Sequence, residues 1–174
     1  MRLRVRLALP LFVLAFAAGC RAGEAANDSV AAAPAARVTV TIATAAGERH
    51  RFTVPVARTP DAQQRGLIYV APVADDGGML FAPYPPEGGP PRVASFWMKD
   101  TPSPLDILFI RADGTIARIA ENAVPFSETL IGSGEPVAAV LEVRGGRASE
   151  LGIAEGDRVD WPGRQAVAAG RQPG

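Results

Sequence analysis

The stretch SFWMKDTPSPLDILFI, residues 95–110, contains a lysine, two carboxylates and three aromatic side chains, two of which precede the lysine. Lys99 is the only lysine of the chain, which uses arginine at the remaining Lys/Arg positions. Lysine carries a compact charge on a thin stem, whereas arginine presents a wide planar fork. We therefore expect Lys99 to enter a narrow, partly buried slot. Trp97, Asp100 and Asp106 could join it there to hold a small anionic or hydroxyl-rich ligand.

A structural reading of Lys99 stands beside this one. An ion pair with Asp106 or Glu142 would pin a loop over the sheet, with the lysine stem lying along Trp97. Arg65 could supply a second anion-binding group, although it also fits the end of a helix, where the dipole favours a cation. The candidate ligand-binding residues are Trp97, Lys99, Asp100, Asp106, Glu142 and Arg65.

Groupings typical of catalysis or metal binding are sparse. His50 is the only histidine and Cys20 the only cysteine, so we expect no His/Cys metal site and no cofactor. Asp75 and Asp76 lack the spacing of an EF-hand loop. IGSGEP, residues 131–136, resembles neither a nucleophile elbow nor a phosphate loop, and we interpret it as a flexible turn. No catalytic residue is assigned.

The N-terminal residues predict export. Residues 1–19 join the basic leader MRLRVR to an apolar stretch that suits a signal peptide and is short for a membrane span. The small residues before Cys20 resemble the lipobox of bacterial lipoproteins. That resemblance implies a lipid anchor at Cys20 on the periplasmic face, on the outer membrane rather than the inner because arginine follows. The alternative is ordinary cleavage that releases a soluble periplasmic or secreted protein.

Charge argues against nucleic acid as a partner. The whole chain has 18 basic and 18 acidic side chains, and three of the arginines lie in residues 1–19. The remainder is mildly acidic, whereas duplex binders carry a basic excess or stripe. The Ala-rich residues 20–36 predict a flexible tether, and residues 162–174 predict a disordered tail.

Period-two patterns dominate the residues between the tether and the tail. RVTVTIAT and RFTVPV alternate apolar and polar positions on either side of a Gly-containing turn, which predicts a β-hairpin. Further short strands are expected before the C-terminal tail, including the nearly continuous apolar run 105–110 and a second hairpin at Asp113-Gly114. Two short helices are expected, one opened by Thr59 and Pro60 and one near residues 148–151. The class is mostly β: a compact sandwich or jelly-roll-like open barrel over residues 37–161.

The same segments, in the same order, resemble the domain of unknown function 192 (DUF192) family of prokaryotes. The matching motifs are QRGLI (64–68), GMLF (78–81), FWMKDTPSPLDILFI (96–110), DGTI (113–116), AVPFS (123–127), VLEVRGG (140–146) and LGIAEGDRV (151–159). The resemblance implies a β-sandwich of jelly-roll type and no agreed activity. The family commonly has asparagine where this chain has Asp100, and methionine where it has Ile68.

The favoured interpretation is a membrane-tethered extracytoplasmic module that binds a ligand or assists a partner without catalysis. One alternative is an envelope carbohydrate-active enzyme that uses carboxylates such as Asp106 and Glu142. Another is a protein-interaction module of an envelope complex, which would expose an apolar patch. We interpret the aromatic residues Phe81, Tyr84, Phe109 and Phe126 as core and loop packing.

Overall fold

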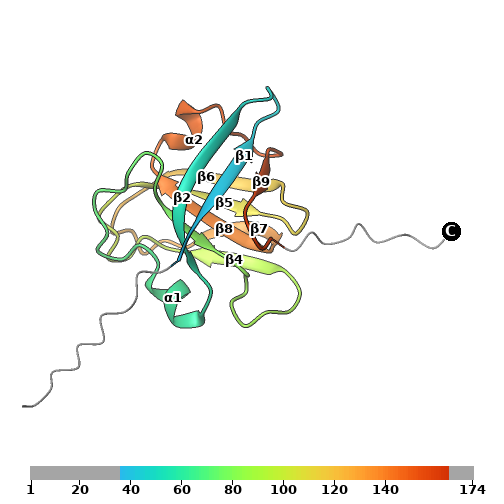
Figure 1. The fold of residues 1–174 in the computed structure, drawn as a ribbon. Helices are drawn as coiled ribbons and strands as arrows, with labels where there is room; N and C mark the ends of the chain where they lie inside the picture. Colours follow the sequence, from blue (N-terminus) through green and yellow to red (C-terminus); the bar gives the residue numbers. More distant parts are fainter. Residues whose placement is uncertain (1–35, 165–174) are drawn as a thin grey trace, which may run out of the picture. The chain divides into compact units, whose positions relative to one another are not determined.

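The computed structural model describes residues 36–164, which contain nine strands and two short helices (Figure 1). The strands are β1 (Arg37–Ala43), β2 (Arg49–Ala57), β3 (Met79–Phe81), β4 (Arg92–Phe96), β5 (Leu105–Ile110), β6 (Ile116–Ala123), β7 (Ile131–Val137), β8 (Ala139–Arg144) and β9 (Arg158–Asp160). The helices are α1 (Pro60–Arg65) and α2 (Arg147–Glu150). The predicted signal peptide, Cys20, the tether up to residue 35 and the tail beyond residue 164 lie outside the described residues.

Seven of these strands form one sheet in the order β6-β5-β8-β3-β2-β1-β9. The sheet curls until its two ends approach each other near the start of β6. There Thr115 forms a β-bridge with Arg158, and the Ile116 N–H donates to the Asp157 carbonyl at 2.9 Å. The remaining pair, β4 and β7, forms a separate antiparallel sheet. The expected mostly-β class is therefore confirmed, as a curled half-barrel with two short helices.

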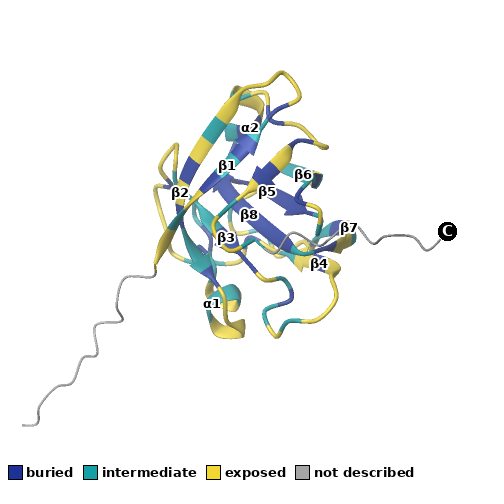
Figure 2. Cartoon of the chain, turned by 45° about the vertical axis from the view of Figure 1, so that its right-hand side comes forward, coloured by how far each residue is buried: buried dark blue, intermediate teal, exposed yellow. Residues whose placement is uncertain are grey.

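An apolar core lies on each face of the large sheet (Figure 2). The inner core fills the curl with side chains such as Val40, Phe52, Leu108 and Leu141. The outer core lies beneath the β4–β7 sheet and α1 and includes Phe81, Met98, Ile107, Phe109 and Val140. Because both faces are covered, all six residues of β5 are buried, as its nearly continuous apolar run predicts.

The first two predicted elements are confirmed. β1 and β2 pair as an antiparallel hairpin in which Val40 faces Phe52. In α1 the Thr59 side chain accepts a hydrogen bond from the Ala62 N–H, and Pro60 occupies the first turn. Gly66 ends the helix with φ +48° and ψ −134°, so its φ is positive but it lies outside the left-handed helical region expected from the sequence.

The flexible turn predicted for IGSGEP is wrong, because residues 131–137 form strand β7. The Ser133 hydroxyl explains how a Gly-rich segment stays extended. It accepts a hydrogen bond from the Ala94 N–H at 2.9 Å and donates to the Glu135 carbonyl at 2.7 Å. These bonds bridge the β-bulge between Val93 and Ser95, where the backbone ladder is interrupted.

Gly78 lets β3 approach β8 closely. Its φ is +142°, and a Cβ atom added there would overlap the backbone carbonyl of Glu142. Only glycine fits both the conformation and the space. Gly78, the glycine of the GMLF motif, therefore allows the backbone just before β3 to pass close to the middle of β8.

Candidate functional site

A cavity of about 250 Å³ opens beside the C-terminal end of α1, on the outer face of the large sheet. It is lined by residues 63–68, by Phe81, Tyr84, Ser95, Phe96, Trp97, Lys99 and Thr101, and by Glu142. The cavity is at the small end of the range for ligand pockets, which suits an occupant of about a dozen non-hydrogen atoms. It is therefore the candidate site of the described domain.

Aromatic side chains give the cavity a rigid wall. The Phe96 ring meets Phe81 edge-to-face with ring centroids 5.1 Å apart, and it meets Phe109 at 6.0 Å. Gly66 turns the chain after α1 close to this wall, since an added Cβ would lie 3.3 Å from the Phe81 ring. The wall is thus formed by side chains that the outer core already holds in place.

The amide of Gln63 is fixed at the other side of the cavity. Its Nε2 donates to the Ala57 carbonyl at 3.0 Å and to the Pro83 carbonyl at 2.7 Å. Both amide protons are used, and the Oε1 atom is buried without a hydrogen-bond partner within residues 36–164. The Gln63 side chain is therefore held in one orientation by the two hydrogen bonds that it donates.

Glu142 is the buried acid of the cavity. It lies in the middle of β8, opposite Ile107 of β5 and Met79 of β3, and its relative exposure is 4%. No hydrogen bond or ion pair within residues 36–164 reaches its carboxyl group, and burial alone raises its pKa to about 8. At neutral pH the side chain is therefore a neutral carboxylic acid that can donate a hydrogen bond.

The rim of the cavity is aromatic and basic. The Lys99 Nζ atom lies 5.7 Å from the centre of the Trp97 ring and 3.9 Å from the Glu128 carboxylate. The expected ion pair of Lys99 with Asp106 or Glu142 is wrong, because Glu128 takes that place. The side chain is about half exposed, so Lys99 stands at the mouth of the cavity rather than in a closed slot. Arg65, at the end of α1, also lines the cavity.

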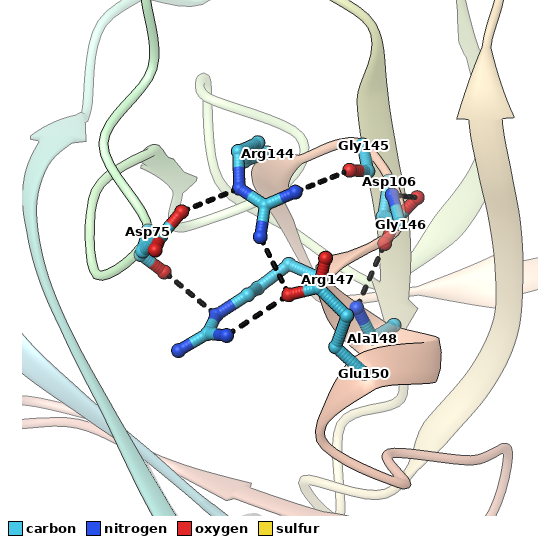
Figure 3. Close-up of polar contacts among 8 residues, drawn as sticks. All are labelled: Asp75, Asp106, Arg144, Gly145, Gly146, Arg147, Ala148 and Glu150. Carbon is cyan, nitrogen blue, oxygen red and sulfur yellow. Dashed lines mark hydrogen bonds and ion pairs between the residues drawn. The ribbon is translucent and has the colours of Figure 1, made fainter.

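Asp106 lies away from the cavity, in the inner face of the same sheet. Its Oδ1 accepts a hydrogen bond from the Asn122 N–H at 2.8 Å. Figure 3 shows the other two, from the Gly146 N–H to Oδ1 at 2.9 Å and from the Ala148 N–H to Oδ2 at 2.8 Å. The side chain is completely buried, and its hydrogen bonds tie β5 to β6 and to the start of α2. Asp106 therefore has a structural task.

The proposed carboxylate pair of Asp106 and Glu142 fails on geometry. Asp106 alternates with Ile107 along β5, and Ile107 packs in the outer core. Glu142 alternates with Leu141 and Val143 along β8, both of which pack in the inner core. The two carboxyl groups point to opposite faces of one sheet and cannot flank a single glycosidic bond.

Asp100 also lies outside the cavity lining. Its φ is +54°, and its carbonyl accepts a hydrogen bond from the Tyr69 N–H at 2.9 Å. Asn and Asp tolerate this left-handed conformation better than other residues with side chains. The asparagine that is common at this position in the DUF192 family and the aspartate of this chain therefore both suit the positive φ of the backbone here.

A network of ion pairs fixes the end of β8. Arg144 donates to the Asp75 carboxylate at 2.6 Å and to the Glu150 carboxylate at 2.5 Å, while Arg147 donates to Glu150 at 3.0 Å (Figure 3). Asp75 is thus engaged with arginine. Within residues 36–164, no group of three or more His, Cys, Asp or Glu side chains is placed to hold a metal ion. The helices of this segment are too short or too polar to cross a membrane.

Sequence reasoning missed Gln63, Phe81 and Phe96 as cavity residues. Gln63 sits on a short helix, where a glutamine normally faces solvent, and nothing in its neighbourhood signals the two carbonyls that hold it. Phe126 was wrongly interpreted as packing, since it is 62% exposed. The structure brings Arg65, Trp97, Lys99 and Glu142 together at the cavity and leaves Asp100 and Asp106 out.

The fold and the cavity define a β half-barrel domain with a small outer-face pocket, and comparisons with known proteins place it in a family. The DUF192 model, described as "Uncharacterized ACR", matches residues 41–161, so the chain belongs to the DUF192 family. No curated protein matches the chain.

Two solved structures are similar to the chain. One is from Sinorhizobium meliloti and is described as a "putative transcription regulator"; it is 45% identical, with 74% of this chain and 96% of that chain covered and a TM-score of 0.69. The other is a protein of unknown function from Novosphingobium aromaticivorans, 42% identical, with coverages of 75% and 94% and a TM-score of 0.67.

Replacing Asp106 by asparagine should destabilise the domain strongly. The Asn side chain would turn an NH₂ group toward a backbone N–H that now donates to a carboxylate, so the free energy of unfolding should fall by about 2–4 kcal/mol. Urea denaturation measures this. Asp75→Asn is the control, because its exposed ion pair should contribute less than about 1 kcal/mol. Equal losses in the two variants would contradict the structural role of Asp106.

Glu142 should make stability depend on pH. Its folded pKa of about 8 lies above the unfolded value, so the folded state holds the proton more tightly and stability from this group is greatest below about pH 4.5. It declines as the pH rises to about 8, by up to about 5 kcal/mol. Unfolding free energies of wild type and Glu142→Gln, measured from pH 5 to pH 8, should diverge in this direction. Parallel pH profiles would show that Glu142 ionises normally.

Proposed function

We propose that this protein is a non-catalytic module that binds a small polar ligand in the cavity beside α1. The observation that carries the proposal is Glu142, a buried acid without a hydrogen-bonding partner within residues 36–164 that lines an open cavity. Because the carboxyl group lines the cavity and has no partner in the described residues, a ligand group in the cavity can form a hydrogen bond with it.

The polar groups of the cavity indicate the chemistry of the ligand. Neutral Glu142 donates one hydrogen bond and accepts others. A hydroxyl or amide group suits this acid, because each can donate and accept. Arg65 and Lys99 at the rim favour a carboxylate or phosphate at the outer end of the ligand. The expected class is a small hydroxylated molecule, neutral or singly anionic.

We further propose that the chain is exported and held at the periplasmic face by a lipid on Cys20. The support is the leader and the lipobox-like residues of the sequence. Sixteen residues separate Cys20 from Arg37, the first residue of β1, which is roughly 50 Å of extended chain. Such a tether allows the cavity to face away from the lipid.

Ligand binding should raise the melting temperature through Glu142. A ligand at one hundred times its Kd adds about 2.7 kcal/mol, which is a shift of several degrees for a domain of this size. The screen covers sugars, sugar acids, nucleotides, phosphates and small peptides. A true ligand should shift wild type and leave Glu142→Leu unshifted, because leucine removes the polar partner and keeps the volume.

Two further variants complete this test. Lys99→Gln should weaken anionic ligands about tenfold and leave neutral ligands unchanged, because it removes one rim charge. Asp75→Asn, distant from the cavity lining, should behave as wild type. A ligand that shifts wild type and Glu142→Leu equally would contradict the assignment of the site.

The lipid anchor is tested by fractionating a Gram-negative host that expresses the full chain. Wild type should sediment with membranes and carry the added mass of acyl chains, whereas Cys20→Ser should not be acylated. If wild type is instead found as an unmodified periplasmic protein, ordinary signal-peptide cleavage is supported. Cys20 is then either an unmodified cysteine of the mature chain or removed with the leader.

A further inference from the structure

Three aromatic side chains stand exposed on loops that meet beside the cavity. Tyr69 follows α1, Trp97 follows β4 and Phe126 follows β6, and their relative exposures are 76%, 47% and 62%. A single exposed apolar side chain is ordinary, whereas several on adjoining loops can form the kind of patch that marks a contact site. We call these three residues the aromatic platform.

Backbone hydrogen bonds hold the three loops side by side. The Tyr69 N–H donates to the Asp100 carbonyl at 2.9 Å, and the Phe126 N–H donates to the Thr101 carbonyl at 3.2 Å. The Met98 N–H donates in turn to the Ser127 carbonyl at 2.9 Å. The loop after β4 is thus the centre of the platform, with the other two loops bonded to it.

Two platform residues are held in an unfavourable backbone conformation. Tyr69 and Phe126 both have φ of +60°, a region that glycine and asparagine enter readily and bulky aromatic residues avoid. Their rings are mostly exposed, so core packing does not account for the choice of residue. Strain kept at an exposed aromatic position is typical of a contact site.

The platform is continuous with the cavity. Trp97 lines the cavity and is half exposed at its rim, and Thr101, which bonds to the Phe126 loop, also lines it. Ile68, the neighbour of Tyr69, is another lining residue. A molecule that leaves the cavity past Trp97 therefore meets the aromatic platform next.

We propose that the ligand is an oligosaccharide whose terminal sugar enters the cavity while the following sugars stack on the aromatic platform. This inference rests on the proposed function of the cavity. A pyranose has hydroxyls that can pair with Glu142, and apolar C–H faces that pack against aromatic rings such as Phe96 and Trp97. Its size also suits the cavity of about 250 Å³.

Charge favours a glycan over a nucleic acid on the platform. Lys99 shares its charge with Glu128, and Asp100 lies in the central loop, so this surface has no basic stripe for a phosphate backbone. A protein partner would use the platform without needing the cavity. These two alternatives therefore predict different effects of the Glu142 variants.

The test compares single sugars with short oligomers on the full chain. The probes are N-acetylglucosamine and galacturonic acid with their dimers to tetramers, titrated by calorimetry. Affinity should rise roughly tenfold or more from monomer to trimer in one series. Tyr69→Asn and Phe126→Asn should abolish this gain and keep the affinity for the monomer, while Val93→Ser, at an exposed position on β4, should change neither.

Asparagine is chosen because it suits a φ of +60°, so these variants should melt no lower than wild type and loss of binding is not loss of fold. The oligosaccharide inference is overturned if monomers bind without a length effect, or if only non-sugar ligands bind. The proposed function stands in either case if Glu142→Leu abolishes that binding. Binding of a protein or single-stranded nucleic acid that ignores Glu142→Leu also overturns the inference. Absence of any Glu142-dependent ligand overturns both.

Discussion

The hydrogen bonds of one buried carboxylate hold the centre of this domain in place. Asp106 projects into the inner core from β5 and binds backbone N–H groups of β6, of the loop after β8 and of α2. Hydrogen bonds to an ionised group are about twice as strong as neutral ones, and a buried carboxylate tolerates no missing donor. The end of β8 is therefore fixed against β5, and the ion pairs of Arg144 with Asp75 and Glu150 reinforce it.

Fixing β8 also fixes Glu142, which projects from β8 to the opposite face of the sheet from Asp106. The two acids differ in what surrounds them. Asp106 has a donor for each oxygen, whereas Glu142 meets apolar neighbours and an open cavity, and burial raises its pKa to about 8. One acid stabilises the fold and the other is left available, a contrast typical of a domain that keeps one polar group for a ligand.

The elements of regular period could be predicted from the sequence, and those that depend on distant contacts could not. The β1–β2 hairpin, the Thr59 cap of α1 and the buried β5 follow from local patterns. Strand β7 was missed because its extended form depends on Ser133 bonding across to β4. The family resemblance is confirmed by the match over residues 41–161.

The candidate site was found in part. Trp97 and Lys99 were predicted from the sequence as candidate binding residues, and both line the cavity together with Arg65 and Glu142. Asp106 was wrongly assigned to the binding site. The alternation of side chains along β5 indicates which residues share a face of the sheet, but it does not indicate which face carries the cavity. The partners of Asp106 lie 16 to 42 residues away in sequence, and no local pattern could reveal them.

The proposed binding site depends on Glu142 being a neutral acid at the cavity, and the titration of Glu142 itself is the direct test. Carboxyl ¹³C chemical shifts of glutamate-labelled protein, with the Glu142 resonance assigned by its loss in Glu142→Gln, would follow the proton itself. We expect a midpoint near pH 8 that moves when a ligand binds. A midpoint near pH 4.5 would mean that Glu142 is an ordinary solvated carboxylate, and the proposed binding chemistry would be wrong.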